Sequence, residues 1–230
     1  MNVIEVTCLS KSFKDIKVLD NVSINFEKGK VYGLIGRNGS GKTMLLKCIC
    51  GFVIPSAGNI KVNNKIIGRE IDVPQSVGII IETPGFLPNY SAFKNLKSLA
   101  MIKGNINKEE ILNAINRVGL DAASKKWVGK FSLGMRQRLG IAQAIMENPE
   151  ILILDEPMNG LDNTGVEEIR KLLLSLKGDG KTIIIASHNK DDISTLCDEV
   201  FEMDKGRLYK VDSSNFVSDK LTTQKYPWWR

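Results

Sequence analysis

One loop of this 230-residue sequence has the residue types and the spacing to hold a phosphate chain. Its residues are Gly36-Arg37-Asn38-Gly39-Ser40-Gly41-Lys42-Thr43, the pattern GxxxxGK[ST], between a predicted strand and a predicted helix. The glycines let backbone N–H groups turn toward phosphate oxygens, because no Cβ stands in the way. Lys42 can reach the β- and γ-phosphates, the Thr43 hydroxyl can bind Mg²⁺, and the positive end of the following helix points at the same anion. The loop therefore predicts a nucleotide-binding site.

Two carboxylates, Asp155 and Glu156, directly follow an apolar strand predicted at 151–154. In an open parallel sheet the ligand lies beyond the carboxyl ends of the strands, so both side chains are expected beside the glycine-rich loop. Asp155 suits a role on Mg²⁺, holding its waters and bonding Thr43. Glu156 can polarise a water for in-line attack on the γ-phosphate. The alternative is a carboxylate pair that only solvates the end of a strand.

The single histidine, His188, follows another apolar strand, predicted at 182–186. A lone histidine is usually a surface or structural residue. Here it emerges at the same sheet edge as Asp155 and Glu156, where its ring N–H can bond the γ-phosphate or the attacking water. We expect hydrolysis of the bound nucleotide in which Glu156 polarises water while His188, Lys42 and Mg²⁺ stabilise charge.

A third candidate site lies at the start of a predicted helix. Its sequence is Ser132-Leu133-Gly134-Met135-Arg136-Gln137-Arg138-Leu139. Ser132 is expected at or near the N-cap, and Gly134 leaves the backbone amides accessible, which together can bind a phosphate. An ordinary capped helix is the alternative. A second phosphate-binding device is useful if it covers the γ-phosphate of a nucleotide held by a second copy of the chain.

Composition excludes several classes of protein. Hydrophobic residues make up 43% and charged residues 25% of the chain, which is the balance of a globular protein and excludes disordered and fibrous classes. The formal net charge is +6, spread along the sequence. No apolar run approaches the ~20 residues that cross a bilayer, so we expect no membrane span. No secretory signal is visible, which favours a cytoplasmic location.

The cysteines and the histidine limit the metal sites that the chain could build. The four cysteines are Cys8, Cys48, Cys50 and Cys197. Only Cys48 and Cys50 are close in sequence, inside an apolar helical stretch, so we predict reduced thiols in the core rather than disulfides or a zinc site. With one histidine, a site built from several histidines is excluded.

Periodicity predicts the elements that position these residues. Strands are expected at 2–9, 22–26, 31–35, 77–81, 151–154 and 182–186, a small hairpin-rich piece up to Gly68, and a terminal hairpin at 199–211. Helices are expected at 43–50, within 92–119, at 134–147 and at 165–176. The domains that follow are an α/β core at 1–85 and 148–212, a helical lobe at 86–147, and a tail at 213–230.

In their order, these motifs resemble the nucleotide-binding subunit of an ABC transporter over residues 2–211. The motifs are the glycine-rich loop, a helical insertion, the SLGMR segment, ILILDEP, Asn159-Gly160-Leu161-Asp162 and a histidine after the next strand. The resemblance implies a P-loop NTPase (RecA-like) α/β core with an N-terminal antiparallel β portion and an inserted α-helical lobe. It implies ATP and Mg²⁺ as cofactors, Phe13 stacked on adenine, and residues 159–162 as a loop that couples two nucleotide sites.

The resemblance also implies partners. Two copies should face head to tail, each glycine-rich loop opposing Ser132 and Gly134 of the other copy, with ATP between them. A separate transmembrane permease should hold the chain on the inner face of the cell membrane and dock on the groove after Glu82 and on the helical lobe. No nucleic acid is expected as a partner.

Two departures from the family pattern stand out. Glu82 replaces the glutamine expected after the strand at 77–81, and its carboxylate would add negative charge to the metal site beside Asp155. The signature segment reads SLGMR, with Ser132 and Gly134 retained. Together with the segment Glu82-Thr83-Pro84-Gly85-Phe86-Leu87-Pro88-Asn89, it resembles export ATPases of the bacitracin- and lantibiotic-resistance type.

Two other functions compete with this one. A soluble ABC-type ATPase acting on nucleic acid or ribosomes usually has paired cassettes, long coiled coils or zinc modules, which this sequence lacks. A P-loop nucleotide kinase would use the helical lobe as a lid, but it would not need the acidic pair and the signature segment. The aromatic, basic tail Lys225-Tyr226-Pro227-Trp228-Trp229-Arg230 is expected to fray or pack locally, with a membrane-interface contact as the alternative.

Overall fold

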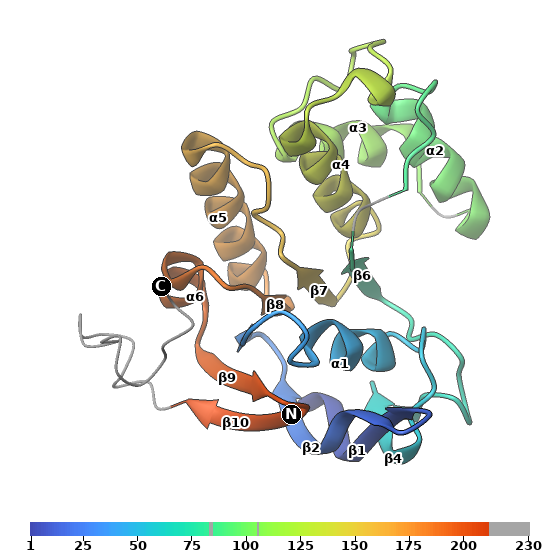
Figure 1. Ribbon diagram of the computed structural model, residues 1–230. Coiled ribbons are helices and arrows are strands. Elements are labelled where there is room, and N and C mark those ends of the chain that lie inside the picture. Colours follow the sequence, from blue (N-terminus) through green and yellow to red (C-terminus); the bar gives the residue numbers. More distant parts are fainter. Residues whose placement is uncertain (83–84, 105, 212–230) are drawn as a thin grey trace.

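Two β-sheets with a helix between them carry the glycine-rich loop (Figure 1). The computed structural model describes residues 1–82, 85–104 and 106–211, so the predicted tail at 213–230 lies outside the described residues. Helix α1 (Lys42–Ile49) lies between an antiparallel sheet and a mostly parallel one. Its Leu45 and Leu46 are fully buried in a cluster with side chains of both sheets. Burying apolar surface on both sides holds the loop that precedes α1 in place.

The first sheet has four antiparallel strands in the order β2-β1-β4-β5. Their bounds are β1 Asn2–Phe13, β2 Ile16–Glu27, β4 Ala57–Val62 and β5 Lys65–Ile66. The first two strands are longer than predicted, because their pairing continues through polar residues to the pair Phe13 and Ile16. The predicted hairpin before Gly68 is confirmed. Its turn residues Asn63 and Asn64 both have positive φ, which suits a two-residue hairpin.

The second sheet has six strands in the order β10-β9-β3-β8-β7-β6. Their bounds are β3 Val31–Ile35, β6 Val77–Ile80, β7 Ile151–Asp155, β8 Thr182–Ala186, β9 Glu199–Asp204 and β10 Arg207–Val211. All neighbours are parallel except the terminal hairpin of β9 and β10, as predicted. Both faces are covered: Ile151 and Ile153 of β7 point to the α1 side, and Leu152 and Leu154 to the opposite side. Two-sided burial explains the uninterrupted apolar runs.

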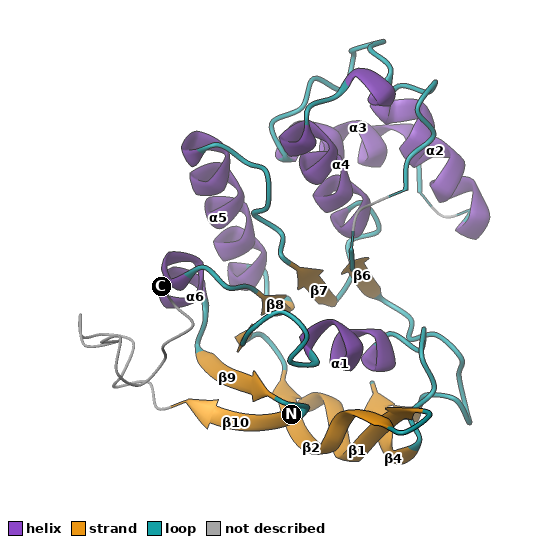
Figure 2. Cartoon of the chain, viewed as in Figure 1, coloured by secondary structure: helices purple, strands orange, loops and turns teal. Residues whose placement is uncertain are grey.

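The remaining helices lie on the other side of this sheet from α1, where α5 and α6 lie side by side and α2, α3 and α4 form a separate group (Figure 2). Their bounds are α2 Ala92–Lys103, α3 Lys108–Arg117, α4 Leu133–Ile145, α5 Asn163–Gly178 and α6 Lys190–Leu196, with a short 3₁₀ helix at Val128–Lys130. The predicted helical stretch at 92–119 is two helices, because Gly104 ends α2 in a left-handed C-cap and Asn107 starts α3 with a capping box. Helix α6 was not predicted.

Helices α2, α3 and α4 lie together at one end of the molecule (Figure 1). We keep the name helical lobe for residues 86–147, and its bounds stay a prediction. Leu96, Ile115 and Leu139, one from each helix, are fully buried in the same cluster as Leu154 of β7. The helical lobe therefore packs directly on the sheet that carries Asp155.

The cysteine prediction is right for two residues. Cys48 and Cys50 are fully buried, and burial raises their pKa to about 11 and about 12. Cys8 is exposed, because the irregular pairing of β1 with β2 turns it outward at φ 49°, so the core assignment is wrong for this residue. Cys197 is partly buried, and all four are free thiols.

Candidate functional site

The glycine-rich loop leaves the end of β3 and enters α1 through two glycines that no other residue could replace without strain. Gly36 has φ 144°, and a Cβ there would lie 2.2 Å from the Met203 carbonyl oxygen. Gly41 has φ 114° and is the N-cap of α1. No side chain caps this helix and no acidic residue lies in its first turn. Its N-terminal N–H groups are therefore available to an anion.

Two buried polar groups of this loop fit a phosphate chain. Ser40 Oγ is the one buried side-chain polar atom in the described part of the chain that has no hydrogen-bond partner. Lys42 is also buried, and its Nζ donates to the carbonyl oxygens of Gly36 at 2.6 Å and Arg37 at 3.2 Å. Burial lowers the pKa of Lys42, and attraction to Glu156 and Asp155 opposes this shift. A phosphate would satisfy Ser40 and offer Lys42 a charged partner.

A cleft of about 400 Å³ opens over this loop. Its walls are Val18, Arg37, Asn38, Gly39, Ser40, Gly41, Lys42, Thr43, Met44, Asp155 and Glu156. Six of the predicted nucleotide-binding residues thus line one cavity. Gly36 does not line it, but its carbonyl oxygen accepts from Lys42 Nζ. The cavity has the size of a small-molecule site.

Thr43 and Asp155, which are 112 residues apart, meet at this cleft. The Thr43 hydroxyl donates to Asp155 Oδ2 at 2.6 Å, as predicted from the common sheet edge. Burial raises the pKa of Asp155, and the bond from Thr43 opposes this shift. No group of three or more metal-binding side chains exists among the residues that the structure describes. A hydroxyl and one carboxylate suit Mg²⁺, which takes most of its ligands from water and substrate phosphates.

Glu156 and His188 lie together at the same edge. His188 Nδ1 is 2.8 Å from Glu156 Oε1, so the predicted placement of this histidine is confirmed. Glu156 has φ 49°, in the left-handed region that residues other than glycine adopt uncommonly. Gln137 of α4 is buried, and its Nε2 donates to the main-chain oxygens of Glu156 at 3.2 Å and Pro157 at 3.1 Å. These bonds hold the strained main chain.

The signature segment does not reach the cleft of its own chain. Ser132 is the N-cap of α4, and its exposed hydroxyl accepts from Met135 N at 3.2 Å, as predicted. Gly134 packs on the loop after β7, where a Cβ would lie 2.7 Å from the Gly160 carbonyl oxygen. This close approach is a second reason for glycine here, besides access to the amides.

Phe13 and Glu82 also lie outside the cleft walls. Phe13 is 47% exposed, and Lys11 Nζ lies 4.8 Å from the centre of its ring. Its stacking on adenine stays a prediction. Glu82 pairs with Lys47 Nζ at 2.5 Å and its side chain is 64% exposed. The negative charge of Glu82 also raises the pKa of Asp155. Its role at a metal stays a prediction as well.

The site includes residues that sequence reasoning missed. Val18 lines the cleft from β2, and Gln137 supports Glu156 from the helical lobe. The position of Gln137 five residues after Ser132, on the inner face of an amphipathic helix, could have drawn attention to it. Nothing in the sequence singles out Val18.

Comparison with known proteins agrees with this geometry. The family model described as ABC transporter matches residues 19–159. The chain belongs to the ABC transporter family. It is 50% identical over 218 residues to the uncharacterized ABC transporter ATP-binding protein YybJ of Bacillus subtilis, covering 92% of this chain and all of YybJ. It is 42% identical over 226 residues to the bacitracin transport ATP-binding protein BcrA of Enterococcus faecalis, covering 97% of this chain and 73% of BcrA.

A solved ABC structure has the same fold. CbiO1 of Clostridium perfringens, described as part of the ABC transporter complex CbiONQ, superposes with a TM-score of 0.82 at 30% identity and covers 98% of this chain and 94% of its own. The predicted α/β P-loop NTPase fold and the predicted family are confirmed. As an ABC ATPase, this chain binds ATP and hydrolyses it.

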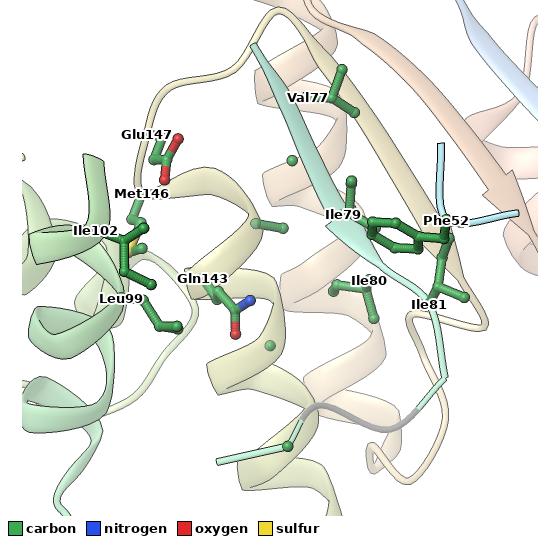
Figure 3. A pocket seen from close by; sticks show the side chains of 14 residues that line it. Phe52, Val77, Ile79, Ile80, Ile81, Leu99, Ile102, Gln143, Met146 and Glu147 are labelled. Carbon is green, nitrogen blue, oxygen red and sulfur yellow. The ribbon is translucent and has the colours of Figure 1, made fainter. Parts of the chain in front are cut away.

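The ABC ATPase also has an apolar groove away from the nucleotide cleft. It holds about 460 Å³ between β6, α2 and α4 (Figure 3). Its walls include Phe52, Ile79, Leu99, Ile102 and Gln143. Strand β6 is the outer strand of its sheet, so one side of the groove is a sheet edge. Within the described residues, no helix is both long enough and apolar enough to cross a bilayer.

Proposed function

We propose that this chain is the ATPase subunit of an exporter of a peptide antibiotic, in which ATP closes a dimer of two cassettes and so drives a separate permease. The bacitracin transport relative, at 42% identity, supports the export role. The family assignment favours this function over a nucleotide kinase. Hydrolysis is expected to need no nucleic acid.

The observation that supports the dimer is that α4 contributes no described wall to the cleft of its own chain. Its described walls come from residues 18, 37–44 and 155–156, and none comes from α4. The N-terminus of α4 instead presents the exposed Ser132 hydroxyl and the 52% exposed Leu133 side chain to solvent. A head-to-tail partner would bring this helix end to the γ-phosphate, where its N–H groups are favourable.

The residues of one cleft divide the reaction among them. Lys42 would leave its carbonyl partners for the phosphates and offset their charge. Glu156 would accept the proton of the attacking water, and His188, 2.8 Å away, would orient that carboxylate. Thr43 and Asp155 would hold Mg²⁺, which would neutralise charge on the transferred phosphate. Removing the base is therefore expected to trap the closed state.

A Glu156→Gln variant tests the dimer. With saturating Mg·ATP, light scattering should show the mass of two chains, because glutamine keeps the shape of the side chain but cannot accept the proton. Adding Ser132→Arg should return the mass to one chain by placing a bulky charge at the seam. The matched control is Ser98→Arg on the exposed surface of α2, which should leave the dimer intact. A Glu156→Gln protein that stays monomeric would contradict the proposal.

The apolar groove is the site at which we propose that the permease docks. A short permease helix could bury its apolar face against Leu99, Ile102 and the edge of β6, which would hold the ATPase on the inner face of the cell membrane. Ile102→Glu should abolish copurification of the membrane protein while the isolated chain keeps its ATPase activity. The control is Met101→Glu, since Met101 is also exposed but does not line this groove. Unchanged copurification of the Ile102 variant would place the permease elsewhere.

A further inference from the structure

A buried ion pair lies behind His188 and has no part in the reaction described above. Asp192, in the first turn of α6, is 1% exposed. Its Oδ1 accepts two hydrogen bonds from Arg170 of α5, from Nε at 3.0 Å and from Nη2 at 2.7 Å. The Arg170 side chain is 13% exposed, and its Nη1 also pairs with Glu167 at the surface. Burying a carboxylate costs free energy unless it is paired in this way. We therefore asked what the buried position of Asp192 does for its neighbours.

The second oxygen of this carboxylate faces the segment that carries the histidine. Ser187 is 2% exposed, and its hydroxyl donates to Asp192 Oδ2 across 3.5 Å. The same hydroxyl accepts from Asn189 N at 3.1 Å, and Ser187 N donates to the Leu34 carbonyl oxygen of β3 at 3.2 Å. The Asn189 side chain in turn caps α6. Both neighbours of His188 are thus fixed through one buried network.

Among the residues that the structure describes, the His188 ring has a single polar contact. Its side chain is 63% exposed, and this contact joins His188 Nδ1 to Glu156 Oε1. An exposed ring on an ordinary loop would sample several rotamers and would meet Glu156 only part of the time. A rigid main chain at 187–189 limits that freedom.

We infer that Asp192 is a positioning residue, which Arg170 fixes against α5 and which holds the main chain of Ser187 and Asn189 so that His188 meets Glu156. The inference rests on the proposed role of His188 in hydrolysis. It predicts that Asp192 acts on the reaction only through the histidine. If the pair only joined α5 to α6, its loss would instead lower stability without changing the position of the His188 ring.

The experiment uses the full chain and the variant Asp192→Asn, which keeps the size of the side chain and removes its charge. His188 is the single histidine of the sequence, so its ring gives one assigned pair of ¹H–¹³C signals. We expect these signals to shift and broaden in the nucleotide-free variant, and single-turnover hydrolysis to slow by about tenfold to a hundredfold, since small misplacements of catalytic groups have effects of this size. The matched control is Glu167→Gln, which removes the exposed partner of Arg170 and should leave both readouts unchanged.

A double-mutant comparison separates positioning from a general loss of structure. In a His188→Ala background, Asp192→Asn should slow single-turnover hydrolysis by less than about twofold further, because the two residues act in series. Independent, multiplicative losses would overturn the inference, and so would unchanged ring signals in Asp192→Asn. If Asp192→Asn does not fold, Ser187→Ala breaks the same network and must give the same signal changes. If His188→Ala hydrolyses ATP normally, the proposed role of His188 fails, while the ring signals still decide whether Asp192 positions it.

Discussion

Replacing Gly134 by alanine would separate two reasons for a glycine at the start of α4. One reason is functional: a bare backbone would let the helix N-terminus approach a phosphate on a second chain. The other is internal: Gly134 lies against the loop that follows Glu156, near Gly160. Only the internal reason acts in a monomer without nucleotide.

The size of the internal effect follows from the geometry. A Cβ on Gly134 would lie 2.7 Å from the Gly160 carbonyl oxygen, which is main chain and cannot rotate away. Overpacking of this kind costs about 1–3 kcal/mol. The better helix propensity of alanine offsets roughly 0.5–1 kcal/mol of that cost. The net loss of about 1–2 kcal/mol corresponds to a fall in Tm of roughly 2–8 °C for a chain of this size.

The assay is thermal unfolding of the nucleotide-free protein, with Gly178→Ala as the matched control. Gly178 ends α5 with open space around its Cα, and its φ is not positive, so alanine there should raise Tm by a few degrees. We therefore expect Gly134→Ala to lower Tm and Gly178→Ala to raise it. If Gly134→Ala is as stable as the wild type, the close approach to Gly160 is not a constraint. A defect seen only in ATP-dependent dimerisation would then assign this glycine to amide access alone.

Three further predictions follow from the site and the cysteines. Ser40→Ala removes a buried hydroxyl without a partner, so the nucleotide-free protein should unfold at the same or a higher temperature. The Kd for ATP, measured by calorimetry, should rise about five- to tenfold. A clear loss of stability would show that the Ser40 hydroxyl has a hydrogen-bond partner without nucleotide. Glu82→Gln should still hydrolyse ATP but with weaker dependence on Mg²⁺, and an unchanged Mg²⁺ titration would remove Glu82 from the metal site. At pH 8 iodoacetamide should modify the exposed Cys8 first, with the fast phase absent from Cys8→Ser. Burial raises the pKa of Cys48 and Cys50 above the usual 9.0, to about 11 and about 12. The contribution of these buried thiols to folding stability is therefore fully present below about pH 9 and is lost as the pH rises through 11–12. Rapid labelling of four thiols in the folded protein would contradict this assignment.

The sequence by itself determined the parts of the site that depend on local spacing. A glycine-rich loop between an apolar strand and a helix has few main-chain conformations open to it, so the loop from Gly36 to Thr43 could be identified without a structure. The apolar runs before Asp155 and His188 likewise fixed these residues at the carboxyl ends of parallel strands. The N-cap role of Ser132 needed only the pattern of one helix.

Only the tertiary structure decided which side chains meet. The register of β7 on β8 sets Glu156 beside His188, and the packing of α4 on the sheet brings Gln137 to the main chain of Glu156. The partners Arg170 and Asp192 lie 22 residues apart on different helices, and no periodicity marks them as a pair. Contacts of this kind depend on strand register, helix crossing and side-chain rotamers together, and local spacing carries none of these quantities.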